Sequence, residues 1–342
     1  MQIDAFRPST VPLGRLVRLG VVLDTRNPIG RIREIARMCD RAGIDAVWVR
    51  DHLAAPDGEP RVEAWTALAM AGAETERAVV GAVLDPSFRP PATLGAMAGT
   101  LDAAMGGRLE LGFTAGWWER EHRDFGLAFP DTGARSATME GYVRVVRQLL
   151  SGEPVTTSEP VELREAELGV ASPQPGGPRV SIEALAPSQI SVAVRVADDV
   201  LVPARSARDV EGAVARIRAV CEQEGRDPAT MGVAMEVPVS VGRTESEAEV
   251  RARDEVLFDT IGHPAEVGIF GTLEQCQARV VELAHAGVSD LLCVVPNNPD
   301  VQDVIAQLTA IAVGTVDVLA PGAPKSKPPD PPTTWGGRRR SD

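Results

Sequence analysis

The sequence predicts an α/β protein folded as a (β/α)8 TIM barrel, and two observations lead to this prediction. Short β-branched runs alternate with longer segments whose apolar residues recur at helical spacing, which is typical of parallel β/α units. The alternation yields eight candidate strands, which is the number in such a barrel. An open doubly wound sheet remains the alternative, although no Gly-x-Gly-x-x-Gly turn follows the first strand.

The elements of the predicted barrel can be placed one by one. Ile32, Ile35 and Cys39 share one apolar face, which predicts a first helix that Gly43 can end. Strands are predicted at 18–23, 45–49, 78–84, 109–114, 179–184, 199–202, 232–241 and 290–295. Helices are predicted at 29–42, 64–75, 90–104, 135–150, 188–197, 207–224, 245–257 and 275–286, with 301–313 closing the barrel.

Two segments depart from the repeat. Residues 151–178 are rich in proline and glycine and predict an excursion, interpreted as a small hairpin over the barrel mouth. We expect this excursion and the loop at 260–271 to carry substrate specificity, as insertions at the C-terminal face of the strands. Residues 1–320 are predicted to form one domain, and the proline-rich 321–342 a disordered tail.

Composition excludes several classes of function. The formal net charge of −13 argues against a nucleic-acid or anionic-membrane partner. The chain has two lysines, both in the tail, so lysine Schiff-base chemistry is excluded from the barrel. No apolar run is long enough to span a bilayer, and no signal peptide is recognisable. We expect a cytoplasmic protein with free, buried thiols at Cys39, Cys221, Cys276 and Cys293.

Polar residues directly after barrel strands face the active site, and this rule selects the candidate site residues. The residues selected are Arg50, Asp51, His52, Asp85, Ser87, Arg89, Thr114, Ala115, Gly116, Trp117, Glu183, Pro203, Arg205, Asn297 and Asn298.

His52 is the first candidate for acid or base work, because imidazole titrates near neutrality, and Asp51 or Glu59 would tune it. Alternatively, His52 caps a loop through hydrogen bonds and takes no part in catalysis. His122 lies in a charged run and is predicted to sit on a solvated helical turn. No cluster with metal-ligand spacing and no Gly-x-Ser-x-Gly elbow occurs, so we expect neither a metal site nor a serine nucleophile.

The small residues Thr114, Ala115 and Gly116 admit two interpretations. They would let a flat ligand approach the backbone closely, or they form a tight turn that leaves the strand. Trp117 and Trp118 would either wall an apolar pocket or pack as a lid on the barrel mouth.

Several segments together resemble the bacterial luciferase-like oxidoreductases. They are 43–52, 77–92 (RAVVGAVLDPSFRPPA), 101–116 with Glu121, His122, Phe125 and Gly126, and 271–272 with 286–295. The resemblance spans roughly residues 19–313. It implies a luciferase-like barrel that binds coenzyme F420, a deazaflavin, or alternatively FMN, and acts as an oxidoreductase or monooxygenase.

The resemblance also implies roles for particular residues. Deazaflavin-dependent glucose-6-phosphate dehydrogenases carry an Asp-His pair that matches Asp51 and His52, with the histidine near the hydride-transfer centre. A non-prolyl cis peptide would fall near Ala82 and Val83. The implied cofactor-binding residues are Asp51, Ala82, Val83, Leu84, Asp85, Thr114, Ala115, Gly116, Trp117 and Ala184.

Two departures from that pattern bear on function. Trp117 replaces an acid of the sugar-phosphate enzymes, so their substrate is not expected here. Glu183, Ala184 and Leu185 replace a glycine turn that receives the cofactor phosphate, which would then need backbone amides or arginine.

Two rival functions remain. One is a cofactor-independent isomerase, cyclase or lyase with Glu183 and His52 as acid and base, and the other is a non-catalytic flavin-binding barrel. We further expect a small-molecule substrate, a homodimer, and a separate flavin reductase if FMN is the cofactor.

Overall fold

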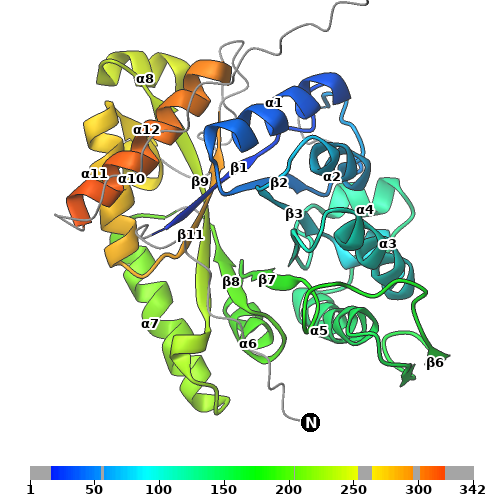
Figure 1. Cartoon of the computed structure of the whole chain (residues 1–342). Helices are drawn as coiled ribbons and strands as arrows, with labels where there is room; N and C mark the ends of the chain where they lie inside the picture. Colours follow the sequence, from blue (N-terminus) through cyan, green and yellow to red (C-terminus); the bar gives the residue numbers. More distant parts are fainter. Residues whose placement is uncertain (1–16, 55–57, 204, 253–263, 296–300, 320–342) are drawn as a thin grey trace, which may run out of the picture.

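The computed structural model describes residues 17–54, 58–203, 205–252, 264–295 and 301–319. Within these ranges eight parallel strands close into a barrel that helices surround (Figure 1). The strand order is β1, β2, β3, β4, β7, β8, β9, β11, and β11 pairs in parallel with β1. The predicted TIM barrel is confirmed, and the open-sheet alternative is wrong because β8 and β9 also pair.

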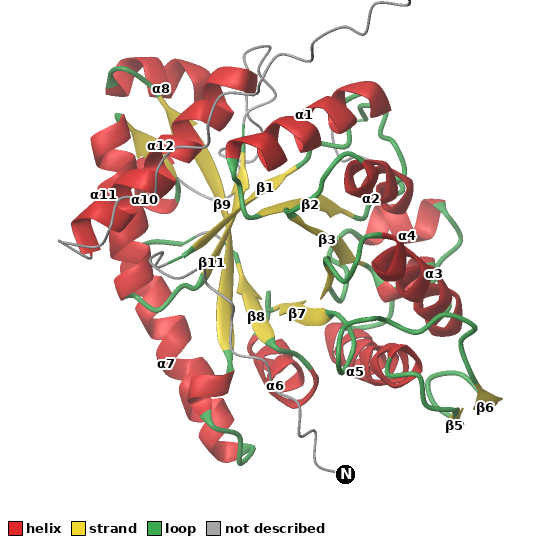
Figure 2. Ribbon diagram, viewed as in Figure 1, coloured by secondary structure: helices red, strands yellow, loops and turns green. Residues whose placement is uncertain are grey.

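The predicted elements are found with small shifts at their ends, except that residues 253–257 of the helix predicted at 245–257 lie outside the described residues (Figure 2). The barrel strands are β1 (Arg18–Val22), β2 (Ala46–Arg50), β3 (Val79–Leu84), β4 (Leu109–Phe113), β7 (Arg179–Glu183), β8 (Asp199–Val202), β9 (Gly232–Val241) and β11 (Asp290–Val294). The surrounding helices are α1 (Ile29–Ala42), α2 (Ala64–Ala73), α3 (Pro91–Ala104), α5 (Thr132–Leu150), α6 (Pro187–Val196), α7 (Ala207–Gln223), α11 (Leu273–His285) and α12 (Val301–Leu319).

Additional short elements decorate the barrel. They are β10 (Ile269–Gly271), which pairs with the end of β9, the helices α4 (Glu119–Asp124), α8 (Glu245–Ala252) and α10 (Pro264–Val267), and 3-10 turns at Pro86–Phe88 and Pro228–Thr230. Of these, α4 lies in the connection from β4 to α5, which is an insertion at the C-terminal face of the barrel.

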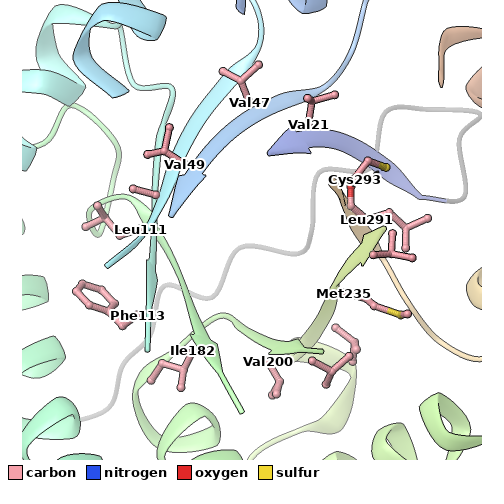
Figure 3. Close-up of a cluster of buried hydrophobic side chains, with 14 of the residues drawn as sticks. Val21, Val47, Val49, Leu111, Phe113, Ile182, Val200, Met235, Leu291 and Cys293 are labelled. Carbon is pink, nitrogen blue, oxygen red and sulfur yellow. Dashed lines mark hydrogen bonds between the residues drawn. The ribbon is translucent and has the colours of Figure 1, made fainter. Parts of the chain in front are cut away.

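One face of every barrel strand packs against the helices. Because side chains alternate along a strand, every second residue points away from the barrel axis. Val47, Phe113 and Ile182, labelled in Figure 3, are among these residues, and all three are fully buried. They belong to one continuous core of Val, Ile, Leu and Ala side chains that fixes the helices on the barrel.

The alternate residues fill the barrel interior, where a single large side chain dominates. Trp48 of β2 packs there with Val22, Val83, Leu201 and other small or apolar side chains. A Cβ at Gly81, its neighbour on β3, would lie 2.6 Å from the Trp48 ring. Gly81 is therefore needed in β3 because the indole occupies the space of a side chain.

A charged cluster closes the interior at the N-terminal ends of the strands. Arg18 Nη1 lies 2.9 Å from Glu110 Oε1 and 3.2 Å from Asp290 Oδ1. Arg179 binds the carboxylate of Asp199 in the same layer. Buried charges need partners of this kind, so these side chains tie strands β1, β4, β7, β8 and β11 together below Trp48.

The excursion at 151–178 is a hairpin, as predicted, but its predicted position is wrong. Strands β5 (Val155–Thr157) and β6 (Leu163–Ala166) pair antiparallel and pack on Val145 and Leu149 of α5. Ser172 and Gln174 then bond Asp102 of α3. The segment joins the C-terminal end of a helix to the start of a strand, so it covers the outside of α3 and α5 and not the barrel mouth (Figure 1).

The predicted cis peptide near Ala82 and Val83 is also wrong, because the described residues contain one cis bond, at Glu159–Pro160. Ala82 and Val83 pair regularly with β2 and β4 on either side, and trans backbone preserves both ladders.

Two compositional expectations can be compared with the structure. The four cysteines are buried and unpaired, as predicted. Among the described residues no helix is long and apolar enough to cross a membrane. The predicted disordered tail, 321–342, lies outside the described residues.

A glycine-to-alanine pair tests the packing of Trp48. We expect Gly81→Ala to lower the free energy of unfolding by about 1–3 kcal/mol, the usual cost of overpacking. Gly30→Ala in α1 is the control, since nothing lies within 4 Å of its added Cβ and alanine favours a helix. Urea denaturation of both variants measures the difference, and equal stability would contradict the packing described.

Candidate functional site

The candidate site lies at the C-terminal ends of β2, β3 and β4. A small pocket there encloses about 10 Å³, roughly the space of one water molecule. Its lining comprises Arg50, Asp51, His52, Val83, Asp85, Thr114, Gly116, Trp117, Trp118, Glu121 and His122. The lining includes six of the predicted cofactor-binding residues, namely Asp51, Val83, Asp85, Thr114, Gly116 and Trp117, together with His52.

His52 is oriented by a buried carboxylate on α4. Its Nδ1 lies 3.2 Å from Glu121 Oε2, and Glu121 Oε1 accepts hydrogen bonds from Leu53 N and Ala54 N. Burial alone would raise the pKa of Glu121, but the bond from His52 and the two amides hold it below its ordinary value. Glu121 therefore fixes both the His52 ring and the loop that follows β2, a role the sequence assigned to Asp51 or Glu59.

His122 is buried, and the prediction of a solvated helical turn is wrong for it. Its Nδ1 donates to the carbonyl oxygen of Trp118 at 3.1 Å, and its Nε2 contacts Ser87 Oγ at 3.0 Å and Asp85 Oδ2 at 3.2 Å. The rings of Phe88 and Phe129 pack on it. Helix α4 thus sends Glu121 to the loop after β2 and His122 to the loop after β3.

Asp51 forms an ion pair beneath the site. Both carboxylate oxygens accept from Arg89, at 2.5 and 3.1 Å, and Arg89 also binds Glu63 and is held at its carbonyl by Tyr142. Burial raises the pKa of Asp51 in spite of Arg89. Asp51 is therefore used to join the ends of β2 and β3 and does not contact His52 through a hydrogen bond.

A second charged cluster lies inside the barrel near its mouth. Arg50 Nη2 donates to Glu183 Oε1 at 2.6 Å, and Arg50 Nη1 binds Glu236 of β9. Burial raises the pKa of Glu236, while Arg50 opposes this effect. Glu183 therefore points inward as its strand position implies, yet it contacts Arg50 and not His52.

The turn after β4 is shaped by its glycine. Gly116 has a φ of +74°, and a Cβ there would lie 2.6 Å from Asp85 Oδ2. A tight turn therefore explains why residue 116 is a glycine, without a ligand close to the backbone. Trp117 is 49 % exposed, stacks on Trp118 and meets His52 edge-on at 6.0 Å.

Several candidates point away from the pocket. Ala82, Leu84, Ala115 and Ala184 have side chains in the core shared with the helices, because alternation along each strand turns them outward. They can meet a ligand at the mouth only through backbone atoms. Pro203 and Arg205 follow β8 outside the pocket lining, and Asn297 and Asn298 lie outside the described residues.

The turn after β7 has its amides occupied. Gln189 Oε1 accepts from Leu185 N at 2.7 Å and from Ala186 N at 2.8 Å. These are two of the amides that could have received a phosphate in place of the missing glycines. The side chain of Gln189 therefore occupies these two amides at the start of α6.

Three buried polar atoms at or below the mouth have no hydrogen-bond partner within the described residues. They are Thr114 Oγ1, Glu183 Oε2 and Trp48 Nε1. A buried polar group without a partner is costly, so these atoms indicate where a bound water or ligand would complete the hydrogen bonding.

Glu121 is not among the site residues predicted from the sequence, and His122 is predicted to be solvated. Both belong to one charged run, which in isolation is typical of an exposed helix. The available signal was the position of the run directly after a strand end, where the rule for barrels would have included it.

Comparisons with known proteins agree with the barrel fold and identify the protein family to which the chain is similar. Residues 16–264 match the model of a family described as luciferase-like monooxygenase. The chain is 24% identical to 5,10-methylenetetrahydromethanopterin reductase of Methanolobus tindarius over 86% of this chain and 99% of that protein. F420-dependent glucose-6-phosphate dehydrogenase of Kineococcus radiotolerans is 32% identical over 44% of this chain and 48% of that protein.

A solved structure is similar over almost its whole length. An F420-dependent secondary alcohol dehydrogenase in complex with an F420-acetone adduct superposes with a TM-score of 0.77 and 19% identity, covering 88% of this chain and 99% of that one. At 19% sequence identity, this structural similarity shows the barrel fold alone.

The role of Glu121 can be tested by a matched pair of substitutions. We expect Glu121→Gln to lower the free energy of unfolding at neutral pH by about 1–3 kcal/mol, because buried bonds to His52 and two amides are weakened. Glu119→Gln, an exposed residue of the same helix, is the control and should change little.

The pH dependence of this effect follows from the lowered pKa of Glu121. A carboxylate with a lowered folded-state pKa stabilises the protein above its ordinary pKa, and this stabilisation is lost as the pH falls. The difference between wild type and Glu121→Gln should therefore shrink on acidification. Urea midpoints at several pH values measure it, and a constant difference would contradict the assignment.

Proposed function

The chain belongs to the luciferase-like monooxygenase family, and from this premise we propose that it is an F420-dependent oxidoreductase acting on a small organic substrate beside His52. The named relatives are oxidoreductases, and two of the three proteins compared above carry F420 in their names. The observation that carries the proposal is the His52–Glu121 pair at the end of β2, beside the exposed Trp117.

The residues at the mouth fit a flavin-like ring in their chemistry. Thr114 Oγ1 and Glu183 Oε2, which have no hydrogen-bond partner among the described residues, are buried and would reach such a ring only through bound water. The pocket, with space for about one water molecule, is far smaller than a tricyclic ring. His52 and Trp117, which keep exposed surface at the pocket, are therefore the side chains that would touch the bound ring. When bound, the reduced deazaflavin would supply a hydride to an electrophilic carbon.

The contribution of the chain is to hold a proton where the substrate reacts. Because the ionised Glu121 accepts from Nδ1 of His52, that nitrogen carries hydrogen and Nε2 is left for the substrate. Trp117 meets the His52 ring edge-on, with the ring centroids 6.0 Å apart. We propose that His52 takes up a proton from solvent at Nε2 and donates it to the substrate, while Nδ1 keeps its hydrogen bond to Glu121.

FMN with oxygen activation is the second candidate, because the family is described as monooxygenase. It would need a separate flavin reductase as partner. The cofactor-free rival is less well supported, since Glu183 contacts Arg50 and the carboxylate at His52 is Glu121. A homodimer in the cytoplasm stays a prediction.

Titration with cofactors tests the proposal directly. We expect the purified chain to bind F420 with micromolar affinity or better in calorimetry, and FMN more weakly, because the strand ends after β2 and β3 resemble the deazaflavin branch. Tighter binding of FMN would transfer the proposal to the monooxygenase. Absence of binding to either would refute it and favour the cofactor-free rival.

Replacement of His52 tests the assigned proton. We expect His52→Gln to lower kcat by about 10²–10⁴-fold, the range typical of general acid catalysis, while the dissociation constant of F420 stays within about twofold. His285→Gln, an exposed histidine on α11, is the matched control. Full turnover in His52→Gln would show that the proton comes from elsewhere, and weakened F420 binding would indicate a ring-positioning role.

A further inference from the structure

Arg135 holds the backbone of the turn that follows β4. It lies near the start of α5, and its Nε donates to the carbonyl oxygen of Ala115 at 2.9 Å. Its Nη2 lies 3.5 Å from the carbonyl oxygen of Gly116, and its Nη1 donates to the carbonyl oxygen of Pro130. All three acceptors are uncharged backbone atoms, so the guanidinium joins the segment that enters α4 to the segment that leaves it.

The guanidinium also packs on an aromatic ring. Arg135 Cζ lies 3.8 Å from the ring centroid of Phe129, whose ring lies 4.7 Å from that of His122. His122 Nδ1 in turn donates to the carbonyl oxygen of Trp118 at 3.1 Å. Because a cation is attracted to the face of an aromatic ring, Arg135, Phe129 and His122 form one continuous support for the turn.

Trp117 lies between the two backbone points that are held. Arg135 contacts the carbonyl oxygen of the residue before it, Gly116. His122 binds the carbonyl oxygen of the residue after it, Trp118. Gly116 has a φ of +74°, a conformation that favours glycine, so the shape of the turn is specific. The backbone at Trp117 is therefore fixed from both sides.

The indole of Trp117 is a large apolar surface that stays 49 % exposed. It stacks on Trp118, with ring centroids 6.2 Å apart, and it meets His52 edge-on, with ring centroids 6.0 Å apart. An exposed side chain ordinarily changes rotamer freely, and ordering it costs a ligand part of its binding free energy. The fixed backbone and the two neighbouring rings limit the positions of this indole before any ligand arrives.

We propose that Arg135 is a positioning residue for ligand binding, because it holds the turn that carries Trp117 and keeps the indole beside His52 as a preformed face for a planar ring. An indole offers a flat apolar face to which other rings stack or pack edge-on. Arg135 acts on the ligand only through Trp117. The inference rests on the proposed function for the identity of the ring, whereas the hold of Arg135 on Trp117 is independent of it.

A purely structural role for Arg135 has different consequences. In that case its loss would loosen the whole barrel mouth and weaken ligand binding equally with or without the Trp117 indole. If Arg135 acts through Trp117, its loss has no further effect on affinity once the indole is gone. The two substitutions are then non-additive, as is typical of residues that are coupled.

The hold on Trp117 can be measured without any cofactor. In full-length protein with protonated tryptophan and histidine in a deuterated background, we expect a nuclear Overhauser effect between the rings of Trp117 and His52. Arg135→Met keeps an aliphatic stem over Phe129 but removes the donors, and should abolish this signal. Arg144→Met, at an exposed position of the same helix, is the matched control and should retain it. A wild-type signal in Arg135→Met would overturn the proposal, as would absence of the signal from the wild type.

The consequence for binding is tested by a double-mutant cycle in calorimetry, with F420 as the probe. We expect Arg135→Met to raise the dissociation constant by about two- to tenfold, which corresponds to the cost of ordering one side chain on binding. In the Trp117→Leu background the same substitution should leave the dissociation constant unchanged. An equal increase in both backgrounds would show a purely structural role and overturn the proposal.

Failure of the proposed function is distinguishable from failure of this inference. If the wild type does not bind F420, the proposed function is refuted, and the signal between the two rings still decides whether Arg135 holds Trp117. If FMN binds instead, it replaces F420 as the planar probe in the cycle. Should Arg135→Met not fold, Arg135→Lys is measured in its place, because lysine keeps the charge but lacks the planar fork that reaches several carbonyl groups.

Discussion

The site depends on one buried carboxylate, that of Glu121. It lies on a helix of six residues that has no stability of its own at that length, so the helix is held by what Glu121 and His122 bind. Glu121 ties it to the loop after β2 and His122 ties it to the loop after β3. Three loops that would otherwise be independent at the barrel mouth are thereby fixed relative to one another, and His52 receives its orientation.

The barrel interior places further limits on the site. Trp48 fills the middle of the barrel because Gly81 leaves space for it, and the cluster of Arg50, Glu183 and Glu236 lies near the mouth. Charged side chains at this depth need exact partners, and each described contact of Arg50 is with a carboxylate. A ligand at the mouth would therefore meet carboxylate acceptors and a hydroxyl group. The guanidinium of Arg50 is already bound to carboxylates.

The chain shares some structural features with its family and departs from it in others. The barrel, the Asp-His pair after β2 and the small residues after β4 follow the resemblance. The trans bond between Ala82 and Val83, the exposed Trp117 and the capping of Leu185 and Ala186 by Gln189 do not. These differences lie at the mouth, where luciferase-like enzymes of one fold can diverge in substrate and cofactor.

The sequence by itself determined the barrel fold and most bounds of its helices and strands, since these follow from local periodicity. It also determined that the candidate site lies at the C-terminal ends of the strands, which follows from the rule for barrel enzymes. It also placed His52, Asp85, Thr114 and Trp117 at the pocket. Only the tertiary structure decided which partner each carboxylate contacts. Glu121 contacts His52, Asp51 contacts Arg89, and Glu183 contacts Arg50. These pairs join residues distant in sequence, and no periodicity records such contacts. For the same reason Glu121 and His122, two residues of a charged run that looks solvated, are buried where their helix folds back over the barrel mouth.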